Sequence, residues 1–150
     1  MAQNLNQFQQ TAERGQIALL CANSPLISAV VDSTETGTLK AGDAVKLVST
    51  SKGIPHVVLV GSGDTACCGL VAFNPVKNDG IKAGDRVEIA ITGAFMYMVA
   101  SAAINAGAAV DYAYATGKVA TANSGLACGV AIDAAAADGD LIRVAVKAII

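Results

Sequence analysis

The sequence predicts an all-β, mainly strand, domain for three reasons. Short alternating apolar runs recur along the chain, one turn-then-strand phrase is used three times, and no segment keeps a helical period over three turns. The clearest copy of the phrase is residues 81–91. Its Gly84 falls where a type II turn requires a positive φ, which glycine tolerates because it has no Cβ. Val87, Ile89 and Ile91 then alternate with Arg, Glu and Ala, as in a half-buried strand.

Two further copies of this phrase lie at residues 39–47 and, in a more divergent form, at residues 104–112. A second repeat relates residues 69–91 to residues 129–146, since each begins with a glycine-led apolar run and ends, after a loop, in an alternating strand. Such units pair antiparallel strands around a shared core, and closing the sheet hides the strand edges. We therefore predict a compact antiparallel β-barrel or β-tulip-like domain with at most short helical turns.

The expected strands are short apolar or β-branched runs bounded by turn-forming residues. In order, they are residues 16–22, 26–31, 44–50, 56–60, 67–73, 86–91, 94–99, 110–114, 118–120, 128–132 and 141–146. We expect residues 94–99 to return as the partner of residues 86–91. A single helical turn is expected at residues 100–104, and Gly107 would prevent it from continuing.

Turn chemistry explains the breaks between these strands. Residues 23–25 are Asn-Ser-Pro, residues 32–38 form a polar loop, residues 74–75 are Asn-Pro and residues 78–80 are Asn-Asp-Gly. Residues 116–117, Thr-Gly, are typical of a hairpin tip. Each predicted strand is therefore separated from the next by residues that favour a reversal of the chain.

Composition restricts the classes of function. The chain of 150 residues is 53% apolar and 15% charged, which rules out disorder of the whole chain and allows one domain with a real core. The formal net charge is −2 and the Lys and Arg residues are scattered, so the basic patch of a nucleic-acid binder is missing. A surface with few charges favours assembly with other chains.

The cysteines favour buried free thiols in a reducing compartment. The chain has four, Cys21, Cys67, Cys68 and Cys128. Adjacent residues such as Cys67 and Cys68 do not meet the geometry of a disulfide. No Cys-x-x-Cys pair occurs and His56 is the sole histidine, so zinc-ligand spacing is absent. We expect neither a metal nor a cofactor.

Targeting and membrane segments are not expected either. The first residues contain no basic region followed by an apolar one, so we expect no secretory signal. Residues 89–110 carry no charge and would be long enough to cross a bilayer. However, Thr, Gly, Ser and Asn interrupt this segment, alanine inserts poorly, and its first part belongs to an alternating strand. We therefore predict no contact with a membrane.

Two motifs resemble nucleotide-binding loops. Residues 61–66 read G-x-G-x-x-A after a strand, which in a dinucleotide-binding fold would open a helix. Gly69 and Pro75 break the residues that follow, so a plain turn is favoured. Residues 116–119 resemble the end of a phosphate-binding loop, but Val119 stands where a Ser or Thr is required. We expect no catalytic, cofactor-binding or metal-ligating residues.

The sequence predicts an extended arm over residues 1–15 and a single β-rich domain over residues 16–150. The arm is rich in Gln and Asn, with Leu5 and Phe8 as its larger apolar groups after Met1. Alone, such a segment buries too little surface to offset its ordering entropy. It either frays or becomes ordered on a partner, and the two readings stay open. The candidate interface residues are Leu5, Phe8, Gln9, Gln10 and Arg14.

Taken together, these features resemble a family of tailed-bacteriophage proteins, the small capsid decoration or cement proteins, formerly a domain of unknown function. The resemblance covers about residues 16–150. It rests on the turn phrase, on residues 115–119, and on residues 129–132 with an Ala/Asp loop and a closing strand at residues 143–146. The family implies a β-rich fold and no catalysis.

The resemblance also implies a place and partners. Family members sit on the outside of an icosahedral head, commonly as trimers where capsomers meet, and are made in the host cytoplasm. The implied partners are the major capsid protein and further copies of the chain, with no nucleic acid and no membrane. The alternatives are another virion component such as a tail or fibre-base protein, a host β-barrel adaptor, and a dinucleotide-binding enzyme.

Overall fold

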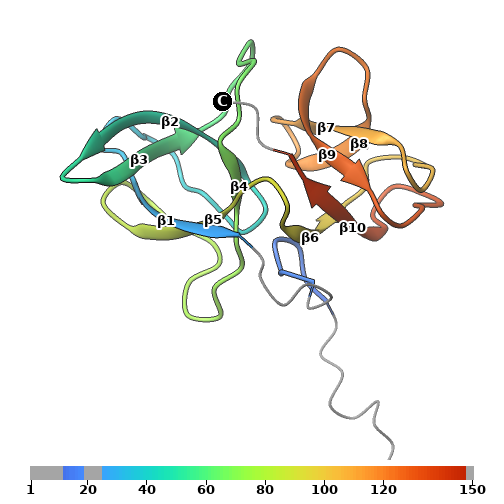
Figure 1. The fold of residues 1–150 in the computed structure, drawn as a ribbon, viewed down its shortest axis with the longest axis horizontal. Coiled ribbons are helices and arrows are strands. Elements are labelled where there is room, and N and C mark those ends of the chain that lie inside the picture. The colour runs from blue at the N-terminus through green and yellow to red at the C-terminus, as the bar shows by residue number, and fades with distance from the viewer. Residues whose placement is uncertain (1–11, 19–24, 148–150) are drawn as a thin grey trace, which may run out of the picture.

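The computed structural model describes residues 12–18 and 25–147, and within them it contains ten strands and no helix (Figure 1). The strands are β1 (Leu26–Val31), β2 (Ala44–Ser51), β3 (Ile54–Leu59), β4 (Gly69–Val71), β5 (Arg86–Ala90), β6 (Phe95–Val99), β7 (Ala109–Ala113), β8 (Lys118–Thr121), β9 (Leu126–Ala131) and β10 (Leu141–Val146). The prediction of an all-β protein is confirmed.

The strands form two sheets that follow one another along the chain. The first five close into a barrel in the order β1-β3-β2-β4-β5, with β1 antiparallel to β5 and parallel to β3. The other five form a sheet in the order β6-β10-β9-β7-β8. We call residues 26–91 the first unit and residues 95–146 the second unit. Figure 1 shows them side by side, with β4 and β6 near their junction.

The expected pairing of residues 94–99 with residues 86–91 is wrong. β6 instead pairs antiparallel with β10, with Val99 opposite Leu141. β5 offers no free edge, because β1 and β4 already occupy both of its sides. The chain therefore turns at Gly93, where φ is 98°, and begins the second sheet.

The helical turn expected at residues 100–104 is also absent. Ala100 forms a parallel bridge with Val119, and Ile104 forms an antiparallel bridge with Ala135. These long-range bridges satisfy the backbone groups that a helical turn would otherwise have paired locally.

The three predicted turns have the geometry that the sequence indicated. Their glycines, Gly42, Gly84 and Gly107, have φ values of 87°, 88° and 83°. In each turn the residue after the glycine donates its backbone N–H to the carbonyl three residues earlier, at 2.9–3.1 Å. A fourth turn of this kind, around Gly139 with φ of 93°, precedes β10. The structure thus uses the phrase four times.

The two units are copies of one five-stranded pattern. Read from its other edge, the second sheet has the order β8-β7-β9-β10-β6, which repeats β3-β2-β4-β5-β1 position by position. The parallel contact that closes the first barrel pairs Val31 with Val57. Its counterpart in the second unit is the parallel bridge between Ala100 and Val119. The second unit is therefore a five-stranded sheet whose edges approach at the same place through a single bridge.

The two units also contain equivalent backbone hydrogen bonds between their turns and their strands. In the first unit they join Gly42 and Asp43 to Val71, and Gly84 and Asp85 to Val31; in the second they join Gly107 and Ala108 to Ala131, and Gly139 and Asp140 to Ala100. Two equivalent glycines, Gly69 and Gly129, allow close strand approach, since a Cβ at either would collide with the carbonyl of Ala90 or Ala145. These shared constraints define which residues of the two units are equivalent.

Each unit has its own buried interior. In the first unit it is formed by Ala29, Val31, Leu39, Val45, Val57, Cys68, Val71, Ile81, Val87 and Ile89. Each of these residues has a buried counterpart in the second unit: Met98, Ala100, Ile104, Val110, Val119, Cys128, Ala131, Ala135, Ile142 and Val144. The second core also extends onto the outer face of the first unit, which joins the two units into one body.

Candidate interaction surfaces

The described end of the arm lies against both units. The backbone N–H of Gly15 donates to the carbonyl of Tyr97 at 2.7 Å, and Tyr97 donates to Gln16 at 2.8 Å, so residues 15–18 extend the second sheet beside β6. Phe73 of the first unit donates its N–H to the carbonyl of Gly15 at 2.9 Å. The arm is therefore attached at the junction between the units.

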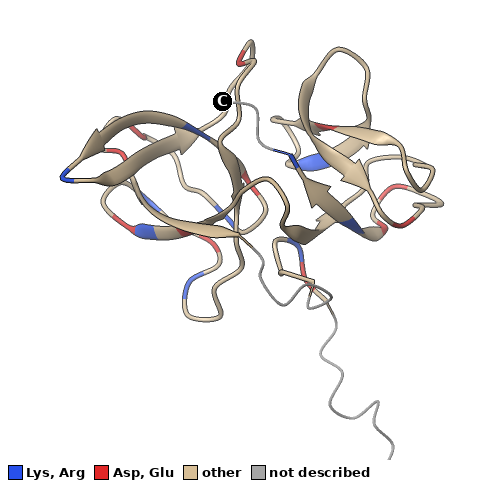
Figure 2. Cartoon of the chain, in the orientation of Figure 1, with Lys and Arg blue, Asp and Glu red and all other residues tan. Residues whose placement is uncertain are grey.

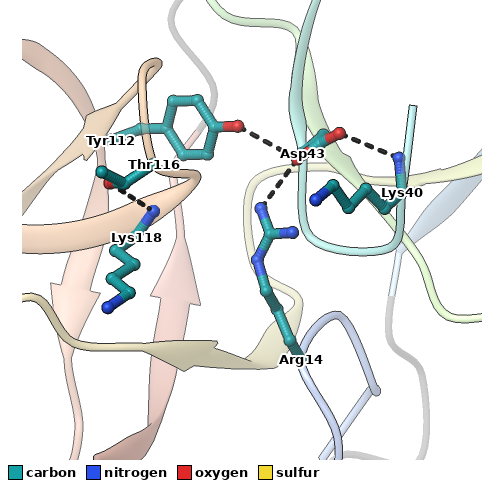
Figure 3. A network of polar contacts seen from close by, with 6 residues as sticks. All are labelled: Arg14, Lys40, Asp43, Tyr112, Thr116 and Lys118. Atoms are coloured by element: carbon teal, nitrogen blue, oxygen red, sulfur yellow. Dashed lines mark hydrogen bonds and ion pairs between the residues drawn. The ribbon is translucent and has the colours of Figure 1, made fainter. Parts of the chain in front are cut away.

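Arg14 belongs to a polar network at this junction (Figure 3). Its guanidinium Nη2 donates to Oδ1 of Asp43 at 2.8 Å, and the hydroxyl of Tyr112 donates to the same oxygen at 3.2 Å. The backbone N–H of Lys40 donates to the other carboxylate oxygen at 2.8 Å. Gly117 leaves room for the guanidinium, because a Cβ there would lie 2.6 Å from Nη2. One carboxylate thus ties together the arm, the first unit and the second unit.

Burial determines the electrostatics of this network. Asp43 is only 5% exposed and Tyr112 only 4%. Burial, and then the negative charge of Asp43, raises the pKa of Tyr112 to about 12, so its hydroxyl stays protonated and can donate. Of the five candidate interface residues, Arg14 is thus placed in contacts within the chain. Leu5, Phe8, Gln9 and Gln10 lie outside the described residues.

The G-x-G-x-x-A motif forms a turn and lines a cleft of about 520 Å³ between the two units. Asp64 accepts the backbone N–H of Gly61 at 2.6 Å and the ammonium of Lys46 at 2.8 Å, which lowers the pKa of Asp64. Asp111 lines the same cleft, whereas no Lys or Arg is among the described residues that do so. β4 follows the motif instead of a helix, so this cleft does not suit a dinucleotide phosphate.

The hairpin tip and the histidine have structural partners. Gly117 donates its N–H to Ala113 at 2.7 Å between β7 and β8, which confirms the predicted hairpin. Nδ1 of His56 lies 3.2 Å from a carboxylate oxygen of Asp32. The pKa of Asp32 is lowered first by the backbone N–H and hydroxyl of Thr34, and then by His56. Asp32 therefore contacts both Thr34, in the loop that follows β1, and His56, in β3.

Cys67, Cys68 and Cys128 are buried free thiols, as predicted, and Cys21 lies outside the described residues. Burial raises the pKa of all three described thiols, that of Cys67 to about 11. Cys67 comes from the outer face of the first unit and lies near enough to Cys128 in the second to raise its pKa further. These thiols thus mark the packing between the units.

Charge does not gather on either unit. Figure 2 shows basic and acidic residues dispersed over the loops and strands of both. Residues 89–110 form parts of β5, β6 and β7, and among the described residues no helix is long and apolar enough to span a membrane. The surfaces that remain for recognition are therefore apolar or mixed rather than charged.

An apolar hollow of about 430 Å³ lies at one end of the first barrel. We call it the first mouth; its lining includes Ile27, Leu47, Thr50, Pro55, Cys68 and Ile91. Leu47 is 48% exposed there, although it is a large aliphatic side chain. An uncovered apolar hollow of this kind is typical of a site that binds another protein. Single-sequence reasoning missed it, because Leu47 alternates like any strand residue.

Comparison with known proteins adds one finding. A sequence model of a family described as phage cement protein matches residues 27–147, which span both units except for Leu26. No curated protein sequence gives a match.

Proposed function

We propose that this chain, which belongs to the phage cement protein family, binds the outer surface of a bacteriophage head and holds adjacent capsomers together against internal pressure. In this proposal it acts as a trimer at the points where capsomers meet. Its partners are the major capsid protein and further copies of itself.

Family membership is the observation that carries this proposal. The match over residues 27–147 confirms the resemblance noted in the sequence, and it makes the chain a structural protein of the phage virion. The family is a structural one, which agrees with the expectation that the chain is no enzyme. The position on the head, the trimer and the resistance to pressure are the further steps that we propose.

The attachment of the arm supports a mechanical role. Residues 14–18 are bonded to β6 of the second unit, to Phe73 of the first unit and, through Arg14, to Asp43. A pull on residues that precede this segment would therefore be borne by both units at once. We propose that residues 1–11, with Leu5 and Phe8 as anchors, become ordered on the capsid.

A cement protein needs no single tight contact. Because it binds the assembled shell and not the free subunits, it stabilises the shell by mass action. A trimer repeats each contact three times, and multivalent attachment then strengthens binding without a new kind of interface. An interface of about 800 Å² per partner would be ordinary for each contact.

Binding to heads that lack the protein tests the proposal. Purified full-length chain is mixed with such heads, and co-sedimentation is expected to give stoichiometric occupancy. Deleting residues 1–11 is expected to abolish co-sedimentation while circular dichroism still reports the β fold, since the deletion ends before Arg14. Leu5→Ser with Phe8→Ser should reproduce the loss, and Gln3→Ser with Asn6→Ser, at arm positions outside the candidate interface residues, is the matched control.

The outcomes separate the parts of the proposal. Failure of the full-length chain to bind heads would overturn the proposed function. Binding that survives the deletion unchanged would overturn only the role of the arm. A cryo-EM map that places the protein on the tail or fibre base would favour the alternative of another virion component.

A further inference from the structure

The mouth of the second unit is closed by the first unit. Five of the six residues named at the first mouth, all but Thr50 beyond the irregularity in β2, have the equivalents Met96, Tyr112, Gly117, Cys128 and Val146, which we call the second mouth. Met96, Tyr112, Cys128 and Val146 are all less than 5% exposed. The first mouth, in contrast, leaves Leu47, the counterpart of Tyr112, 48% exposed. One of two equivalent sites is thus occupied and the other is open.

The surface that closes the second mouth is a wall of apolar side chains. It is formed by the outer face of β2, β4 and β5 with adjoining residues, and we call it the first wall: Ala44, Cys67, Leu70, Ala72 and Ala90. These residues share one hydrophobic cluster with the second mouth and are at most 8% exposed. The hydrogen bond from Tyr112 to Asp43, which precedes Ala44, fixes this arrangement, and Cys67 and Cys128 belong to the same hydrophobic cluster.

The second unit carries an uncovered copy of this wall. The equivalent residues, which we call the second wall, are Ala109, Ala127, Val130, Ile132 and Ala145. Ala109 and Val130 are exposed, Val130 at 39%, and the other three are half-buried. Every member is apolar, as in the first wall. Within the chain, therefore, the second mouth contacts the first wall, whereas the first mouth and the second wall have no partner surface among the described residues.

We infer that the first mouth binds the second wall of another copy of this chain, in the arrangement by which the second mouth binds the first wall within the chain. This deepens the proposed self-association and does not depend on binding to a capsid. Such a contact is head-to-tail, so repeated copies close into a ring when the rotation permits. Three chains joined in this way would place six similar units around one axis.

Differences between the two units fit this assignment. Within the chain, the hydroxyl of Tyr112 meets the carboxylate of Asp43. The corresponding residues at the inferred contact are Leu47 in the first mouth and Ala108 beside the second wall, and both are apolar. A buried hydroxyl or carboxylate without its partner would be costly, and here both members of the pair have changed together. The open mouth and the open wall are therefore matched to each other.

The state of the full-length chain in solution tests the inference. Light scattering during size-exclusion chromatography is expected to show an oligomer, and Leu47→Asp and Val130→Asp should each weaken association by roughly 30-fold or more, to monomers. Val48→Asp is the matched control, since Val48 is also 48% exposed on β2 but does not line the mouth. Circular dichroism checks that each variant is folded.

A cross-linking experiment tests the head-to-tail geometry. Leu47→Cys in one chain and Ala108→Cys in another, each with Cys21→Ser, are treated with a short bismaleimide. A covalent dimer is expected in the mixture and in neither variant alone. A monomeric full-length chain, an oligomer that survives Leu47→Asp, or a cross-link in one variant alone would each overturn the inference. Heads that fail to bind would instead overturn the proposed function, so the two failures are distinguishable.

Discussion

The carboxylate of Asp43 holds three segments together, so Asp43→Ala is predicted to loosen the junction between the units. The change removes the acceptor of Arg14 at 2.8 Å, of Tyr112 at 3.2 Å and of the backbone N–H of Lys40 at 2.8 Å. A buried group that loses its partner costs about 1–3 kcal/mol, and a charged one more. With Arg14 and Tyr112 both affected, we expect the free energy of unfolding to fall by about 3–5 kcal/mol.

The second turn of the first unit, around Gly84, supplies the control. Asp85 follows Gly84 as Asp43 follows Gly42, and it also accepts the backbone N–H at the start of its turn, at 2.9 Å. Its remaining partner is the exposed ammonium of Lys77, and exposed ion pairs contribute little. Asp85→Ala is therefore expected to cost much less than Asp43→Ala.

Urea unfolding followed by circular dichroism measures the difference. With an m-value of about 2 kcal/mol/M, the midpoint of Asp43→Ala should fall by about 1.5–2.5 M. The midpoint of Asp85→Ala should move far less. Equal shifts for the two variants would refute the view that the junction network, rather than the turn, gives Asp43 its importance.

Three further outcomes follow from the structure. Gly129→Ala forces a Cβ into the backbone of β10 and should lower the free energy of unfolding by about 2–4 kcal/mol, whereas Gly139→Ala, which meets open space at a positive φ, should cost about 1 kcal/mol, both by urea titration. Hydrogen bonds from Arg143 lower the pKa of Asp133 in the folded chain. The stability that Asp133 contributes is therefore present above its unfolded pKa of about 3.9 and is lost as the pH falls through its lower folded pKa. In Asp133→Asn the dependence of the urea midpoint on pH between 3 and 5 should become shallower. The thiol of Cys67, with a pKa of about 11, should stay unmodified by iodoacetamide at pH 8 until urea unfolds the chain, and rapid labelling of the folded chain would contradict its burial.

Local patterns explain why so much of the fold could be predicted. Alternation of apolar and polar residues indicates a strand and a glycine indicates a turn, and both patterns lie within about ten residues of sequence. The phrase around Gly84 therefore predicted both a turn and β5. The fourth turn was harder to recognise, since Ala replaces the branched residue at its start and one extra residue separates Ala135 from Gly139.

Pairing between distant segments could not be predicted in the same way. Arg14 and Asp43 are 29 residues apart, and Asp43 and Tyr112 are 69 apart, so no spacing rule brings them together. The sheet to which β6 belongs was equally hidden, because its residues alternate as well beside β5 as beside β10. One signal was present in the sequence: the third turn copy has Ala108 where the other three have Asp, and the inferred contact between chains would give that difference a reason.

Two differences between the units bear on the inferred contact between chains. Their interiors stay apolar at every equivalent position, as expected if each unit must still fill its own barrel. Among the differences outside the interiors, two fall at the mouths and beside the walls, where Tyr112 corresponds to Leu47, and Asp43 to Ala108. A duplication that served stability alone would leave the open mouth and the open wall free to change independently. Paired changes at two surfaces that do not touch within one chain are instead expected when those surfaces meet between chains, because each residue then limits what its partner can become.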